Sequence, residues 1–195
     1  SPEFAIGPEL YAGMLKYGEG VDLSLSVVEE VGRADLDRNR RLLAEAAARS
    51  DSARSVEELV KAMGMDHPAA ADLIHESRRL LESIRGYIAD HDLIGLPSEE
   101  RCLVTETPPF MRWAFAAMDT PGLLENRPGD SFYYVTPVED HWPDLQKEEW
   151  LSVFNYSTIQ IIGIHEVYPG HFIHSLHGRS TPSLAGKSLR AYSTS

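Results

Sequence analysis

Apolar and polar positions in the first half of the chain recur with the period of an α-helix. Residues 8–17 predict a short helix that ends before Gly18. A stripe of apolar residues from Ser26 to about Ala48 predicts a long helix. Ser26 and Glu29 at its start have the spacing of a capping box, in which hydroxyl and carboxylate satisfy each other's backbone donors.

Two more helices are predicted before the proline-rich part of the chain. Ser55 and Glu58 repeat the capping box and open a short helix. Asp66, with Pro68 in the first turn, starts a helix that runs to about Ala89. One face of that helix is predicted to be buried, since the following residues share it: Leu73, Ser77, Leu80, Leu81, Ile84 and Ile88.

The pattern changes near residue 96, where prolines become frequent and exclude long helices except around residues 110–118. Residues 101–107 and 131–136 are rich in β-branched and aromatic side chains and predict two short strands, which the flanking prolines place at sheet edges. A last long helix is predicted from near residue 144 through residue 164. The sequence therefore predicts a mainly α-helical domain with a small β element of two strands.

Composition and charge narrow the possible partners. The 195 residues carry a formal net charge of −12, which repels nucleic acid and anionic lipid surfaces. No stretch approaches the ~20 apolar residues of a membrane span. The single cysteine, Cys102, is expected to be a core thiol. Residues 1–4 resemble a cloning scar, so the native N-terminus is not visible and localisation stays open, with the cytoplasm favoured.

Four of the eight histidines lie between His165 and His177. His165-Glu166 is followed by a histidine at position i+6, His171, whereas zinc-binding helices use i+4. Six steps of ~100° put the second imidazole on the wrong side of a straight helix. Pro169 prevents a straight helix, and if Pro169 and Gly170 are extruded as a bulge, His171 returns to the i+4 place. The alternative is a proline-kinked helix with capping histidines, and spacing alone favours neither.

The segment His165-Glu166-Val167-Tyr168-Pro169-Gly170-His171 resembles the His-Glu-x-x-Pro-Gly-His signature of a large, mostly bacterial family of domains of unknown function, number 885. That family is grouped with the helical zinc metallopeptidases of the gluzincin type. Four other segments resemble it too: residues 90–97, 104–112, 132–137 and 149–156. The resemblance implies a helical, peptidase-like fold with a metal cleft, and it implies that this chain is an internal or C-terminally truncated part of a longer member.

Carried onto this chain, the family pattern implies that His165 and His171 bind zinc and that Glu166 is the general base. The third ligand is expected to be a glutamate in a Glu-Gly-Trp motif, which the chain does not contain before it ends at Ser195. We therefore expect a zinc-dependent peptide hydrolase acting on a peptide substrate, seen as a fragment that binds zinc weakly or not at all. Exposed surface is expected to let it self-associate or pair with the missing C-terminal part.

The resulting division of the chain is a scar (1–4), a helical region (5–95) and a strand-containing region with the metal motif (96–195), the last two forming one catalytic-type domain. Weaker candidates complete the picture. His174 and His177 are candidates for substitute metal ligands, although roles on the protein surface are favoured for both. Arg190 and Tyr192 are candidates for binding a substrate carboxylate or oxyanion. One of Tyr133 and Tyr134 is expected to face the cleft, because side chains alternate along a strand.

Residues 131–136 are also expected to bind an extended peptide by edge pairing. Two alternatives to an enzyme remain: a non-catalytic module that binds a peptide or small ligand on the same fold, and a helical structural fragment with no ligand. Metal content distinguishes the zinc-dependent hydrolase from both of these alternatives.

Overall fold

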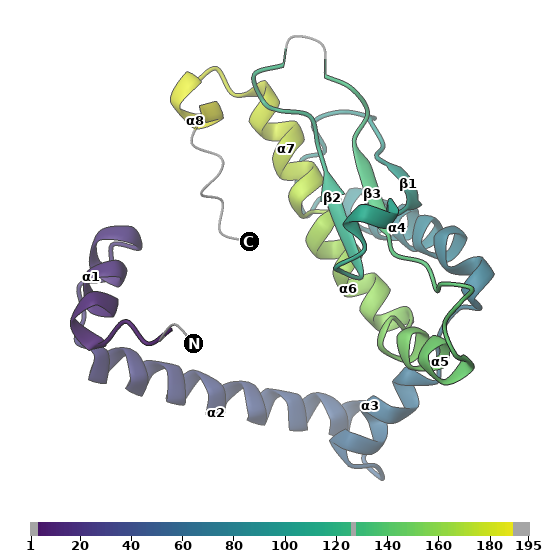
Figure 1. The fold of residues 1–195 in the computed structure, drawn as a ribbon, viewed down its shortest axis with the longest axis horizontal. Coiled ribbons are helices and arrows are strands. Elements are labelled where there is room, and N and C mark those ends of the chain that lie inside the picture. The colour runs from purple at the N-terminus through teal and green to yellow at the C-terminus, as the bar shows by residue number, and fades with distance from the viewer. Residues whose placement is uncertain (1–3, 126–127, 189–195) are drawn as a thin grey trace. The chain divides into compact units, whose positions relative to one another are not determined.

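A computed structural model describes residues 4–125 and 128–188 and divides into two compact units, residues 1–60 and 61–195. In the first unit, helix α1 spans Pro8–Gly18 and α2 spans Leu25–Ser50 (Figure 1). The predicted capping box at Ser26 is wrong. Ser24 caps α2 instead, because its hydroxyl accepts a hydrogen bond from the Val27 amide at 3.4 Å.

Helix α3, Val56–Gly64, crosses the boundary between the units and begins with the predicted capping box. Ser55 and Glu58 exchange hydrogen bonds of 2.8 and 3.2 Å between side chain and backbone. The two units do not divide near residue 96, where the sequence changes in character. The helix that ends at Asp90 packs against the strand that begins at Leu103, so both belong to the second unit.

That helix, α4, spans Leu73–Asp90 and follows a 3-10 turn, Ala70–Asp72. Its start lies later than the predicted one at Asp66, whose carbonyl instead accepts a hydrogen bond from the Tyr156 amide at 3.1 Å. The predicted buried face is confirmed for all members except Leu80, which is half-buried; the buried ones are Leu73, Ser77, Leu81, Ile84 and Ile88.

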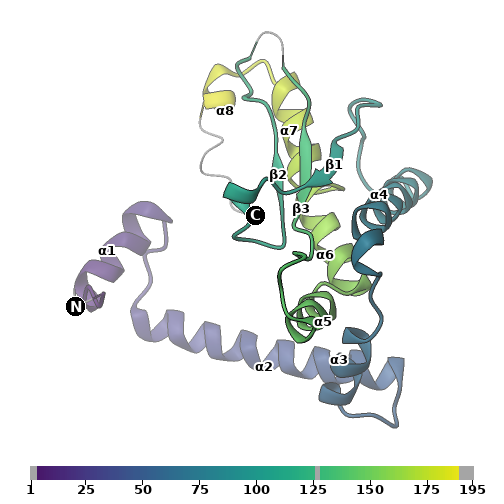
Figure 2. The same cartoon turned by 45° about the vertical axis from the view of Figure 1, so that its right-hand side comes forward.

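Three strands form one sheet in the order β1-β3-β2 (Figure 2). Strand β1, Leu103–Glu106, is parallel to β3, Phe132–Val135, and β2, Ala116–Asp119, is antiparallel to it. The helix predicted around residues 110–118 is therefore wrong: only a 3-10 turn, Pro109–Met111, precedes β2. The strand predicted over residues 131–136 is β3, which lies at the centre of the sheet rather than at an edge. Both of its sides are paired, so the expected edge pairing with a peptide is wrong there.

The remaining helices of the second unit are α5, Asp144–Val153, α6, Tyr156–Glu166, α7, His171–Ser180, and α8, Leu184–Ser188. The single long helix predicted from residue 144 is interrupted, since the Asn155 side chain caps α6 by accepting from the Thr158 amide at 3.1 Å. Helix α4 packs against both α6 and β1, and α6 also contacts β2. The fold is mainly α-helical with a small β element, as predicted. Within the described residues, no helix is long and apolar enough to span a membrane.

Candidate functional site at the junction of two helices

Helices α6 and α7 run end to end and are separated by a four-residue turn, residues 167–170 (Figure 1). The Tyr168–Pro169 peptide bond in this turn is cis. The Val167 carbonyl accepts a hydrogen bond from the Ile173 amide at 3.4 Å, six residues on rather than four. The break predicted at Pro169 is thus confirmed, and it takes the form of two residues inserted into the helical register.

Gly170 makes this junction possible because it has no side chain. A Cβ built on Gly170 would lie 1.6 Å from the His165 carbonyl oxygen and 2.2 Å from its carbon, far inside any van der Waals contact. The first turn of α7 therefore rests directly on the last turn of α6. The residue next to it, His171, is the first residue of α7 and is consequently held close to the end of α6.

The two imidazoles of the motif are brought together by this junction. The ring centroids of His165 and His171 are 4.8 Å apart and the rings are nearly perpendicular, at 89°. His165 is exposed and His171 is half-buried. The neutral imidazole of histidine is the nitrogen ligand that zinc binds most often in proteins.

Glu166 lies between these histidines in the sequence and reaches the sheet. Its Oε2 accepts a hydrogen bond from the backbone amide of Met118, on edge strand β2, at 3.2 Å. The carboxylate is thereby tied to the outer side of edge strand β2. Sequence reasoning missed Met118, because a backbone N–H leaves no signal in the residue type.

Tyr133 and Tyr134 of β3 lie on opposite faces of the sheet, because successive side chains of a strand alternate between its two faces. Tyr133 is fully buried, and its hydroxyl has no hydrogen-bond partner among the described residues. Burial raises the pKa of Tyr133, and the carboxylate of Glu166 raises it further, so the phenol keeps its proton. Tyr134 lies on the opposite face and stacks on Phe132, with centroids 5.6 Å apart. Tyr133 is therefore the one on the side of the motif.

The structure gives the other sequence candidates different surroundings. His177 Nε2 lies 2.9 Å from the Gly95 carbonyl oxygen, which gives that ring a structural contact, and His174 is exposed on α7. Arg190 and Tyr192 lie outside the described residues. In the part of the chain that the structure describes, no group of three or more His, Cys, Asp or Glu side chains is gathered closely enough to hold a metal.

The described features define a mainly helical domain with a small mixed sheet and a paired-histidine motif at a helix junction. Residues 1–192 match the model of a bacterial protein family of unknown function, DUF885, and the chain belongs to this family. A solved structure of a candidate lipoprotein of unknown function from Shewanella oneidensis is similar to it, with a TM-score of 0.77 and 23% identity. The match covers 96% of this chain and 35% of that one, so this chain spans about a third of its length. No curated protein matches the chain.

Proposed function

We propose that this chain is part of a zinc-dependent peptide hydrolase. The observation that carries the proposal is the junction itself, where two imidazoles 4.8 Å apart lie beside a carboxylate held against an edge strand. His165 and His171 are the donors that would hold zinc. They fit two of the three protein ligands of a catalytic zinc site. We propose that the third is a glutamate in a part of the protein outside residues 1–195, because no described side chain completes the set.

When bound, zinc supplies a Lewis acid that polarises an amide carbonyl and makes water more acidic. The role proposed for Glu166 is proton transfer. In amide hydrolysis, water loses a proton as its oxygen attacks the carbonyl, and the leaving amine gains one. The Met118 amide restrains one carboxylate oxygen of Glu166, so the side chain is oriented before substrate arrives.

The free edge of β2 is the proposed site for the substrate backbone. Residues on an antiparallel strand direct their backbone groups alternately toward the partner and away from it. The Met118 amide points away from β3, to Glu166, so the N–H and C=O of Ala116 point to that side too. An extended peptide can pair with such an edge by β-augmentation, which brings its carbonyls past Glu166.

Glu166→Gln tests the proposal in a longer version of the protein that contains the third ligand. We expect zinc content to be unchanged and peptide hydrolysis to fall by roughly 10²–10⁴-fold, because only the proton acceptor is lost. Glu76→Gln is the matched control, since Glu76 also follows a histidine but lies on α4, where its carboxylate pairs with Arg79 at 2.8 Å. Equal turnover of the Glu166 variant and wild type, at equal zinc content, would rule out the base role.

A further inference from the structure

A second site lies on the other side of the motif turn, between α4 and β1. It is a pocket of about 250 Å³ whose apolar wall is formed by Leu81, Leu103 and Val104. Tyr168, from the turn between α6 and α7, also lines it, whereas none of His165, Glu166 and His171 does. An inference about this pocket is therefore independent of the zinc proposal.

Tyr168 is one of the residues that line this pocket, and its hydroxyl is a hydrogen-bond donor that no described residue uses. The residue is 2% exposed, and its hydroxyl has no hydrogen-bond partner among the described residues. Burial raises the pKa of Tyr168, so the hydroxyl retains its proton. Leaving a buried hydroxyl unpaired is unfavourable, and a ligand that accepts its hydrogen bond would recover that free energy.

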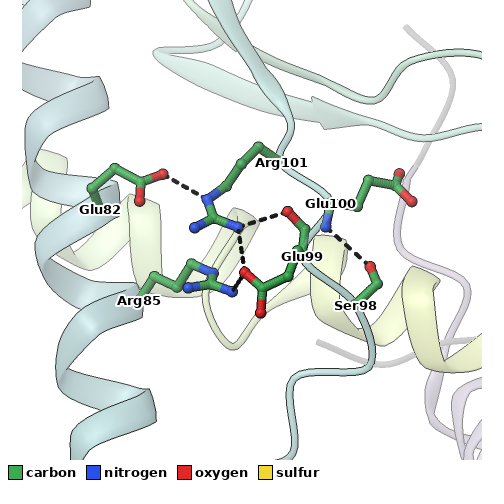
Figure 3. Close-up of polar contacts among 6 residues, drawn as sticks. All are labelled: Glu82, Arg85, Ser98, Glu99, Glu100 and Arg101. Atoms are coloured by element: carbon green, nitrogen blue, oxygen red, sulfur yellow. Dashed lines mark hydrogen bonds and ion pairs between the residues drawn. The ribbon is translucent and has the colours of Figure 1, made fainter.

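The charges around the pocket favour an anion. Arg101 is already neutralised, because its guanidinium meets Glu82 at 2.9 Å and Glu99 at 3.6 Å, and Arg85 also pairs with Glu99 (Figure 3). Arg78 differs: it is an exposed residue of α4 that donates to the Val104 carbonyl at 3.0 Å, and it takes part in none of the ion pairs found among the described residues. A guanidinium has five N–H donors, so several of those on Arg78 remain for a ligand.

Size and polarity narrow the class of anion. The volume is below the ~300–1,000 Å³ of pockets for drug-sized ligands and corresponds to roughly eight water molecules. Glu82 and Arg101 compensate each other, which leaves the single positive charge of Arg78 in the described lining, and a singly charged anion matches it better than doubly charged phosphate. The apolar wall of the pocket favours a ligand that also has an aliphatic part to pack against it. A metal cation is disfavoured by the positive charge of Arg78. Burial also raises the pKa of the Cys102 thiol in the same lining to about 12, so this thiol stays protonated and is a poor metal ligand.

We propose that this pocket binds a small aliphatic monocarboxylate, whose carboxylate is held by Arg78 and the Tyr168 hydroxyl and whose alkyl chain packs on Leu81 and Val104. Because Tyr168 stands two residues after Glu166, such a ligand also contacts the turn that carries the metal motif. The pocket is thus a binding site additional to the histidine pair.

Amide-resolved NMR titration of the 195-residue chain with butyrate tests this inference. We expect saturable shifts at the backbone amides of residues 102–104, and none with butyramide, the neutral isostere, or with inorganic phosphate. Tyr168→Phe is expected to weaken butyrate binding about tenfold or more, since a hydrogen bond to a charged group contributes about 1.5–3 kcal/mol. Arg78→Gln should weaken it further, while Arg33→Gln, an exposed arginine paired with Glu29 on α2, should leave it unchanged.

The stability of Tyr168→Phe separates a ligand contact from a packing role. Its hydroxyl makes no hydrogen bond within the described protein, so the ligand-free variant should unfold at the same urea concentration as wild type, or a higher one. The inference is overturned if butyrate gives no saturable shift, if butyramide or phosphate binds equally well, or if Tyr168→Phe binds butyrate like wild type.

Discussion

Replacing Gly170 with alanine tests whether the helix junction depends on a missing side chain. The new Cβ would lie 1.6 Å from the His165 carbonyl oxygen and 2.7 Å from that of Ile164, whereas ordinary contacts begin near 3.4 Å. Both neighbours are backbone atoms of the last turn of α6, which cannot rotate away as a side chain would. Helix α7 must therefore shift, and His171 with it.

The size of the effect follows from that overlap. Overpacking of a core by added methyl groups usually costs about 1–3 kcal/mol, and here the collision is with backbone, so we expect a loss of about 3 kcal/mol or more. Two other glycine-to-alanine substitutions serve as controls, and both are expected to cost less free energy of unfolding. Gly163→Ala meets the flexible Leu81 side chain at 3.0 Å and should cost less. Gly86→Ala on α4 meets nothing within 4 Å and should stabilise by about 0.5–1 kcal/mol.

Urea denaturation followed by tryptophan fluorescence is the suitable assay, because all three tryptophans, Trp113, Trp142 and Trp150, belong to the second unit. A free energy of unfolding for Gly170→Ala within about 1 kcal/mol of wild type would refute the reasoning, since surface-like substitutions have effects of that order. The same result would show that the absence of a side chain at position 170 is not what brings His165 and His171 together.

Two further predictions concern side chains away from the junction. Folding raises the pKa of His67, mainly through its hydrogen bond to the Pro68 carbonyl and also through Glu148 at 3.2 Å. Its stabilisation is therefore fully present below the unfolded pKa of about 6.5 and is lost as pH rises through the higher folded value. His67→Ala should therefore lower the free energy of unfolding more at about pH 5.5 than at about pH 8.5. We expect the difference to be at most about 1 kcal/mol, because the pair with Glu148 is partly exposed. Urea denaturation at both pH values measures it, and an equal loss of unfolding free energy at the two would contradict the prediction. Cys102 is 8% exposed and burial raises its pKa to about 12, so a thiol reagent at about pH 8 should label it only after urea is added; rapid labelling of the native chain would show that the site opens.

The elements that the sequence predicted correctly are those governed by local rules. The buried face of α4 follows from helical spacing, and the Ser55 cap follows from two side chains three residues apart. Strand β2 was missed because it exists through pairing with β3, whose residues lie some fifteen positions further along the chain. The same pairing moves β3 from the predicted edge to the centre of the sheet.

The candidate site shows the same division. Pro169 and Gly170 indicate a break in the helix, and counting two inserted residues brings His171 back beside His165. The contact of Glu166 with the Met118 amide depends on where a distant strand lies, so no local pattern predicts it. Tyr168 gives no signal either, because only the packing of α4 against β1 makes its hydroxyl buried and unpaired.

Zinc stoichiometry measured after dialysis against a mild chelator tests the central claim most directly. The samples are the 195-residue chain and a longer version extended through the next helix, each as wild type, His171→Ala and His174→Ala. His174 is the matched control, an exposed histidine one turn further along α7. We predict that the longer protein retains one zinc, that His171→Ala loses it, that His174→Ala keeps it, and that the 195-residue chain holds little. Tight stoichiometric zinc in the 195-residue chain, or loss of zinc in His174→Ala with retention in His171→Ala, would contradict the proposed ligands.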